Sequence, residues 1–202
     1  MIVIIDYSMG NSGSILNMLK KIGANAISSS KMPDIEKADK LILPGVGAFD
    51  NGMTNLNKSG LIPILNEIIF NKKIPILGIC LGMQLLAKRS EEGTLSGLGW
   101  LDAEVVRFKF DTSCNLKIPH MGWDTVELVK ENCMFKGLEQ SRFYFVHSYH
   151  VVCHNRLDIL AETCYGYNFV SAVQKDNIIG VQFHPEKSHK FGMTLLRNFV
   201  EL

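Results

Sequence analysis

The sequence predicts an α/β fold, a three-layer sandwich around a mostly parallel central sheet with antiparallel or mixed strands added in the C-terminal half. In the first half, short apolar runs alternate with stretches of helical periodicity, which is typical of a parallel sheet covered on both faces. In the second half, strand-like runs are separated by turns and helices are scarce. We expect the 202 residues, 47% of them hydrophobic, to form a single domain over residues 1–202.

The first half is predicted to be a run of strand–helix units. Apolar or β-branched residues predict strands, and helical spacing predicts helices, the second helix with Pro63 in its first turn. The predicted strands are 2–5, 26–29, 40–43 and 74–79, and the predicted helices are 14–22 and 61–70. Ligands of such sheets bind beyond the carboxyl ends of the strands, where Pro44 and Cys80 lie.

The second half is predicted to add strands and one closing helix. The predicted strands are 105–108, 125–129, 142–152, 159–163, 169–174 and 178–183. Residues 174–177 join two of these runs closely enough to form a hairpin. Residues 188–200 are predicted to be a helix, because Phe191, Leu195, Leu196 and Phe199 share one stripe.

Charge and cysteine content exclude several classes of protein. With 21 basic and 20 acidic residues the net charge is +1, so no broad field favours nucleic acid or an anionic membrane. The N-terminal residues predict neither a signal peptide nor a membrane span, so we expect a soluble protein. Five cysteines without CxxC spacing argue against a disulfide framework or a zinc ribbon and fit a reducing cytoplasm.

The segment 78–82, GICLG, places Cys80 between two glycines at a predicted strand-to-helix turn. This is the Gly-x-nucleophile-x-Gly pattern with Cys in place of Ser, and its glycines permit a strained turn that lifts the side chain above the sheet edge. At a helix N-terminus, partial positive charge lowers the pKa of a thiol and favours the nucleophilic thiolate. The alternative is a buried structural cysteine in a glycine-containing loop.

Residues 180–186, GVQFHPE, place His184 and Glu186 two residues apart, on one side of an extended chain. An imidazole that serves a thiol needs an acceptor on its other N–H, which a carboxylate can supply. Cys80, His184 and Glu186 are therefore a candidate triad. The alternative is a surface His-Pro turn with a solvated Glu, and spacing alone does not exclude the other histidines, which are His120, His147, His150, His154 and His189.

Together, residues 78–84 and 180–186 resemble the class I (triad) glutamine amidotransferase family. More narrowly, the sequence resembles the glutaminase subunits of imidazole glycerol phosphate synthases over nearly its whole length. The segments that carry this resemblance are 4–7, 10–11, 44–47, 119–123, 144–149 and 184–188. Ser8 and Asp124 depart from the Gly and Asn expected there, which leaves loop details open but not the chemistry.

The resemblance implies that Cys80 is the nucleophile, His184 the acid and base, and Glu186 its orienting partner. Glycines at residues 44–47 let backbone N–H groups approach a ligand closely, as an oxyanion hole requires. We expect that hole to use Val46, Gly47 and Leu81, although residues 44–47 could be an ordinary turn. Further residues are expected to bind glutamine, or else to form a half-buried strand end: Gly45, Gln84, Ser148 and Tyr149.

A partner polypeptide is implied, because the chain has no motif for an ammonia acceptor, such as GxxxxGK[ST]. By resemblance this partner is a cyclase subunit with a (β/α)8 barrel, in a heterodimer. Met121 and Trp123 have the composition of interface anchors, although Trp123 could be core. The predicted interface residues are Asn11, His120, Met121, Trp123 and Lys187. We also expect this chain by itself to be a poor glutaminase that its partner activates.

Two other functions remain open at this point. One is a paralogous amidotransferase subunit that feeds ammonia to a different acceptor, such as a surface-sugar modification enzyme; the other is a non-catalytic scaffold that retains the fold. No cofactor and no metal are expected. The remaining cysteines are interpreted as small hydrophobic residues, and the histidines at 147, 150 and 154 alternate too irregularly to suggest a metal site. These cysteines are Cys114, Cys133, Cys153 and Cys164.

Overall fold

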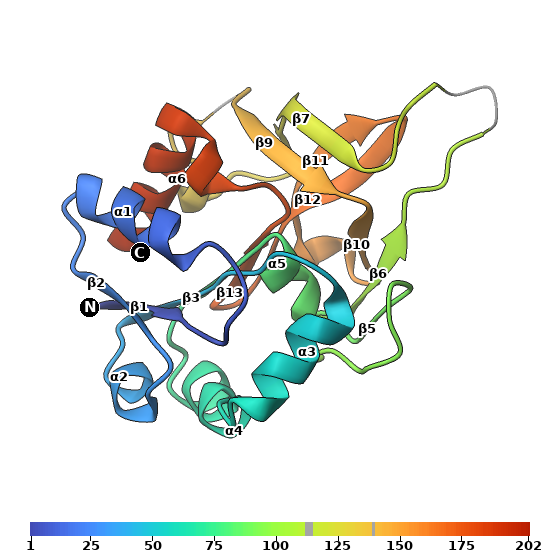
Figure 1. The fold of residues 1–202 in the computed structure, drawn as a ribbon. Helices are drawn as coiled ribbons and strands as arrows, with labels where there is room; N and C mark the ends of the chain where they lie inside the picture. The colour runs from blue at the N-terminus through green and yellow to red at the C-terminus, as the bar shows by residue number, and fades with distance from the viewer. Residues whose placement is uncertain (112–114, 139) are drawn as a thin grey trace.

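The computed structural model describes residues 1–111, 115–138 and 140–202, and they fold into helices on both faces of a twisted central sheet (Figure 1). The order of its main path is β2-β1-β3-β4-β13-β12-β10-β6-β5. The strands at one end of this path are parallel: β1 (Ile2–Ile5), β2 (Ala26–Ser29), β3 (Lys40–Leu43), β4 (Ile76–Ile79) and β13 (Ile178–Val181). Because β13 pairs directly with β4 in parallel, the residues that follow these two strands lie at the same edge of the sheet although they are distant in sequence.

The C-terminal half supplies the antiparallel part, as predicted. Its strands are β6 (Ala103–Arg107), β8 (Glu127–Leu128), β10 (Tyr149–Cys153), β11 (Ile159–Tyr165) and β12 (Tyr167–Lys175), and the short β5 (Arg89–Ser90) lies at the edge beside β6. Within this group only β5 and β6 pair in parallel. A separate two-stranded sheet joins β7 (His120–Thr125) to β9 (Arg142–His147). The predicted α/β class, mostly parallel with added antiparallel strands, is confirmed.

Helices cover both faces of the parallel strands. One face carries α1 (Ser12–Lys21) and α6 (His189–Glu201), and the other carries α2 (Met32–Glu36), α3 (Phe49–Lys58), α4 (Ile62–Asn66) and α5 (Leu81–Leu85) (Figure 1). In β1, Ile4 packs with the first group and Val3 with the second, because successive side chains of a strand point to opposite faces. Burying each such side chain contributes roughly 1.5–3 kcal/mol.

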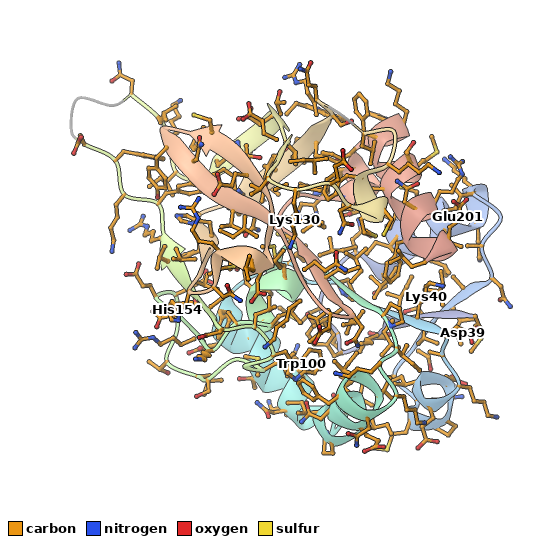
Figure 2. All side chains as sticks on the ribbon, turned by 180° about the vertical axis from the view of Figure 1, so that it is seen from behind. Asp39, Lys40, Trp100, Lys130, His154 and Glu201 are labelled. Carbon is orange, nitrogen blue, oxygen red and sulfur yellow. The ribbon has the colours of Figure 1, made fainter. Side chains whose placement is uncertain are left out.

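A side-chain hydrogen bond connects the chain around α4 to the loop that precedes β6. A π-helical turn, Glu67–Asn71, continues α4. Trp100, which is labelled in Figure 2, donates a 2.8 Å hydrogen bond from its indole to the Asn66 side chain. Short three-ten turns occur at Cys133–Phe135, Arg156–Asp158 and Pro185–Lys187. None of the helices in the described ranges has the length and apolarity needed to cross a bilayer.

The structure differs from the sequence predictions at several elements. The single strand predicted over 142–152 is two strands, β9 and β10, divided at Ser148 where the chain passes between sheets. The strand predicted over 125–129 is replaced by the end of β7 and the short β8. Helix α3 was not predicted, because its Gly and Asn residues have low helix propensity; burial of Phe49, Met53 and Leu56 stabilises it instead.

Candidate active site

Cys80 occupies a strained turn between β4 and α5. Its φ is +54° and its ψ is −111°, a conformation that a non-glycine residue adopts only when the surrounding structure imposes it. The residue is 6% exposed. Glycine is required at residue 82, since a Cβ there would lie 1.9 Å from the Leu43 carbonyl oxygen. A Cβ on Gly45 would likewise lie 2.7 Å from the Gly82 nitrogen, so the 44–47 loop packs directly against this turn.

His184 and Glu186 follow β13, which lies beside β4. The register pairs Gly180 with Gly78, so the chain reaches His184 just beyond the edge where Cys80 lies. The Glu186 carboxylate accepts a 2.8 Å hydrogen bond from His184 Nδ1, and both side chains are 1% exposed. The His184 Nε2 atom is buried and makes no hydrogen bond with the described part of the chain, so it remains available to a group in the pocket.

The environment of His184 favours its charged form. Burial lowers the pKa of this imidazole, but the nearby Cys80 sulfur and the Glu186 carboxylate together outweigh burial and raise the pKa to about 10. The charged imidazolium is therefore the favoured form of His184. Tyr7 also faces this turn: its hydroxyl donates a 2.5 Å hydrogen bond to the Pro44 carbonyl, and burial, with a smaller effect of Cys80, raises its pKa.

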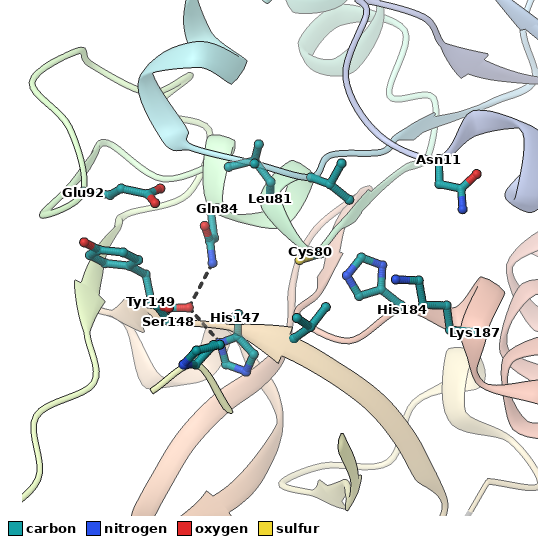
Figure 3. A pocket seen from close by; sticks show the side chains of 14 residues that line it. Asn11, Cys80, Leu81, Gln84, Glu92, His147, Ser148, Tyr149, His184 and Lys187 are labelled. Carbon is teal, nitrogen blue, oxygen red and sulfur yellow. Dashed lines mark hydrogen bonds between the residues drawn. The ribbon is translucent and has the colours of Figure 1, made fainter. Parts of the chain in front are cut away.

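A cavity of about 550 Å³ contains most of the residues that the sequence predicted (Figure 3). Cys80 and His184 line it together with the proposed oxyanion residues Val46, Gly47 and Leu81. The proposed glutamine-binding residues Gln84, Ser148 and Tyr149 also line it, as do Asn11 and Lys187 of the proposed interface. Gly45, the buried residue of the 44–47 loop, packs against the Cys80 turn, and Glu186 is hydrogen bonded to His184. Their roles remain predictions.

Two side-chain amides connect this cavity to the sulfur. Gln84 Nε2 donates to the Tyr149 carbonyl at 2.9 Å and to Gln182 Oε1 at 3.0 Å. Gln182 Nε2 in turn donates to Cys80 Sγ at 3.7 Å. Sequence reasoning missed Gln182 as a contributor, although it lies within the 180–186 motif; its complete burial between two functional side chains is a tertiary property.

Glu92 was also missed, because the loop that carries it has no recognisable motif. It lines the cavity on the side away from His184 (Figure 3). Its Oε2 accepts a 2.8 Å hydrogen bond from the Phe49 backbone. Asp50 accepts hydrogen bonds from the backbone N–H groups of Thr94 and Leu95 and thereby holds the loop. A carboxylate in this position can bind an ammonium group.

The predicted interface residues are not alike in exposure. Met121 is 62% and Trp123 37% exposed on β7, and Trp123 stacks on His189 at 5.5 Å, so Trp123 is not simply core. Lys187 and Asn11 are exposed. His120 is 2% exposed, so its side chain is not available to a partner.

The remaining cysteines and histidines form no metal centre within the described ranges, where no group of three or more His, Cys, Asp or Glu has suitable geometry. Cys153 is partly buried, whereas Cys133 and Cys164 are exposed rather than packed as small hydrophobic residues. Cys114 lies outside the described residues.

The fold and this site define a class of protein. The profile described as "Glutamine amidotransferase class-I" matches residues 3–202, and the chain belongs to that family. Over 202 residues it is 58% identical to "Imidazole glycerol phosphate synthase subunit HisH 2" of Methanococcus maripaludis, covering 100% of this chain and 99% of that protein. It is 56% identical to the protein of the same name in Pseudomonas aeruginosa, with 100% of both chains covered. It is 47% identical to "Imidazole glycerol phosphate synthase subunit HisH" of Leptospira borgpetersenii, again with 100% of both covered.

Solved structures share the fold at low sequence identity. A crystal structure of a glutamine amidotransferase has a TM-score of 0.72 at 22% identity, covering 100% of this chain and 98% of that one. A glutamine amidotransferase from Thermotoga maritima has a TM-score of 0.67 at 21% identity, covering 99% of this chain and 80% of that one.

Proposed function

We propose that this chain hydrolyses glutamine to glutamate and ammonia, and that it is the glutaminase subunit of an imidazole glycerol phosphate synthase in histidine biosynthesis. The observation that carries the proposal is the buried His184–Glu186 pair, whose imidazole lines the same cavity as Cys80 in its strained turn. The identity of 47–58% to HisH subunits over the whole chain supports the pathway.

The proposed reaction is acyl transfer through Cys80. The thiolate attacks the side-chain carboxamide carbon, and the C–N bond breaks as the His184 imidazolium gives its proton to the leaving nitrogen, which departs as ammonia. A thioester remains on Cys80. Neutral His184 then takes a proton from water, the resulting hydroxide attacks the thioester, and glutamate leaves while the Cys80 thiolate is regenerated. Glu186 keeps the imidazole oriented throughout.

The oxyanion of each tetrahedral intermediate is proposed to bind backbone N–H groups of Val46, Gly47 and Leu81. Val46 is 43% exposed and Gly47 has a φ of +102°, so this loop can change its backbone direction at low cost. We expect the isolated chain to be a poor glutaminase until a partner contact orients the loop.

Glutamine is proposed to lie along the cavity with its carboxamide at Cys80. Glu92, on the side away from His184, is placed to pair with the α-ammonium group, and Gln84, Ser148 and Tyr149 offer hydrogen bonds between the two ends. The partner is proposed to be a cyclase with a (β/α)8 barrel that contacts Asn11, Met121, Trp123 and Lys187. The complex is proposed to be cytoplasmic.

The test is glutamine turnover by the purified chain, with and without the candidate cyclase and its ribotide ligand. We expect strong stimulation by the loaded partner, and loss of turnover by at least about 10³-fold in Cys80→Ala. A glutamine-analogue electrophile, diazo-oxo-norleucine, is expected to label Cys80 in the complex. Absence of labelling there would favour a scaffold, whereas high turnover that the partner does not change would indicate a stand-alone hydrolase.

A second candidate function keeps the glutaminase but changes the ammonia acceptor. The two relatives named "subunit HisH 2" are 58% and 56% identical, whereas the Leptospira borgpetersenii protein, whose name has no numeral, is 47% identical. This pattern favours a second subunit of the same kind, which could serve another acceptor. Production of imidazole glycerol phosphate in the reconstituted complex would separate the two functions.

A further inference from the structure

A carbonyl oxygen at the floor of the cavity accepts two hydrogen bonds from side chains of different elements. The Tyr149 carbonyl is 2.9 Å from Gln84 Nε2 and 2.8 Å from His147 Nδ1, and Figure 3 shows both bonds meeting there. A carbonyl can only accept, so both nitrogens must donate. This requirement fixes which atom of the Gln84 amide is the nitrogen and which ring nitrogen of His147 carries a proton.

The direction of the Gln84 amide then determines that of Gln182. Gln84 Nε2 also lies 3.0 Å from Gln182, so that contact must be the Gln182 oxygen. The Gln182 nitrogen is left to donate to Cys80 Sγ at 3.7 Å. Donation to the charged form of a group stabilises that form, so this N–H favours the thiolate. Four contacts thus run from His147 to the reacting sulfur.

On its other side, the ring of His147 faces His120. Burial lowers the pKa of His147 to about 3, so its ring is neutral and carries one proton. With that proton on Nδ1, Nε2 must accept, and His120 Nδ1 lies 3.1 Å away. The other His120 nitrogen, Nε2, lies 3.4 Å from the Asp124 carboxylate, so donation from both nitrogens needs the charged form of His120, which burial disfavours and Asp124 favours. His120 itself is stacked on the Tyr165 ring at 4.0 Å and on the Phe145 ring at 4.9 Å, which fixes its ring plane.

We propose that His147 is a positioning residue of the glutaminase site: by donating to the Tyr149 carbonyl it holds that acceptor where Gln84 Nε2 must meet it, and the Gln84 and Gln182 amides then present an N–H to the Cys80 sulfur. The inference deepens the proposed function and rests on it for its catalytic meaning. The geometry also links the site to β7, because His120 precedes the exposed Met121 on that strand.

The first experiment follows alkylation of the Cys80 peptide by iodoacetamide across pH, in the full-length chain without a partner, with mass spectrometry as the readout. His147→Gln places its amide at the Nε2 position and loses the donor to Tyr149, whereas His147→Asn keeps a donor near Nδ1. We expect His147→Gln to move the alkylation midpoint up by about one pH unit, and His147→Asn to recover most of that shift. His184 and Tyr7, which also face the sulfur, are unchanged in both variants.

Equal midpoints in wild type and His147→Gln, or equal shifts in both variants, would overturn the proposal. Gln84→Ala provides a second test. If His147 acts through Gln84, then adding His147→Gln to Gln84→Ala should shift the alkylation midpoint less than His147→Gln does in the wild-type chain. If the two shifts add fully, His147 does not act through that amide. Because alkylation needs neither glutamine nor the cyclase, its result is independent of whether the complex hydrolyses glutamine.

The wild-type chain offers a test without substitution. Nitrogen-15 NMR of labelled histidine distinguishes the two neutral tautomers, and we expect His147 to be protonated on Nδ1 between pH 6 and pH 8. Protonation on Nε2 would contradict the hydrogen bond to the Tyr149 carbonyl and end the proposal.

Discussion

The two parts of the sheet that meet at the site position their reactive groups by different means. On the β4 side, backbone geometry places the thiol, through a strained turn and glycine contacts that leave no room for a Cβ. On the β13 side, side chains position the reacting groups: a buried carboxylate orients the imidazole, and a hydrogen-bonded set of amides ends at the sulfur. The first arrangement is rigid because it is steric, and the second can be tuned by pH and by single polar substitutions.

The largest effect is expected from a substitution that disrupts the steric contacts on the β4 side. Gly82→Ala would place a methyl group 1.9 Å from the Leu43 oxygen, and we expect it to cost about 4 kcal/mol or more of unfolding free energy. Gly13→Ala is the matched control: it lies in α1 with no atom within 4 Å of the added Cβ, and we expect it to gain about 0.5 kcal/mol. Urea denaturation measures both, and similar midpoints would contradict the close approach.

The next effect concerns the side-chain half. Glu186→Gln removes the carboxylate that accepts from His184 Nδ1 and helps to raise its pKa, so we expect kcat for glutamine hydrolysis to fall by at least about 10²-fold. The pKa of His184 should fall at the same time. Glu201→Gln, an exposed carboxylate near the C-terminus, is the control. A complex that retains full turnover with Glu186→Gln would show that the imidazole is oriented by other contacts.

The pH dependence of stability sharpens the comparison. Burial lowers the pKa of His147 from 6.5 to about 3, so the folded state binds fewer protons than the unfolded state. The contribution of His147 to the free energy of unfolding is therefore complete above pH 6.5 and is lost as the pH falls towards 3. Between pH 7.5 and pH 5 the loss is about 2 kcal/mol. Burial lowers the pKa values of His120 and His150 as well, which adds to the loss, whereas the raised pKa of His184 opposes it.

Urea denaturation at the two pH values checks this dependence. His147→Asn removes the titrating group. Between pH 7.5 and pH 5, the unfolding free energy of this variant should therefore fall by about 2 kcal/mol less than that of the wild type. An unchanged slope in the variant would mean that other groups cause the acid sensitivity.

The smallest expected effect lies on the exposed side of β7. Met121→Ala removes a side chain that is 62% exposed, so we expect no loss of stability but about a tenfold weaker affinity for the cyclase partner. Leu157→Ala, 78% exposed on a three-ten turn, should leave that affinity unchanged. Titration calorimetry gives both dissociation constants. Equal affinities would place the interface elsewhere.

The sequence predicted the local features on both sides of this comparison. The GICLG segment, with a strand before it and a helix after it, indicated the strained turn at Cys80, and the structure has it. Residues separated by two positions indicated that His184 and Glu186 could interact, and they are hydrogen bonded. These features are local, because neighbouring residues of one segment determine their geometry.

Tertiary structure alone decided the rest. The pairing of β13 with β4 brings residues about a hundred positions apart to one edge, and no periodicity encodes which strands become neighbours. The burial of Gln182, His120 and His147, the position of Glu92 and the division of 142–152 at Ser148 likewise depend on packing between distant elements. Sequence patterns determine which way a side chain points from its own strand or helix, whereas the partner it meets there depends on how the whole sheet is assembled.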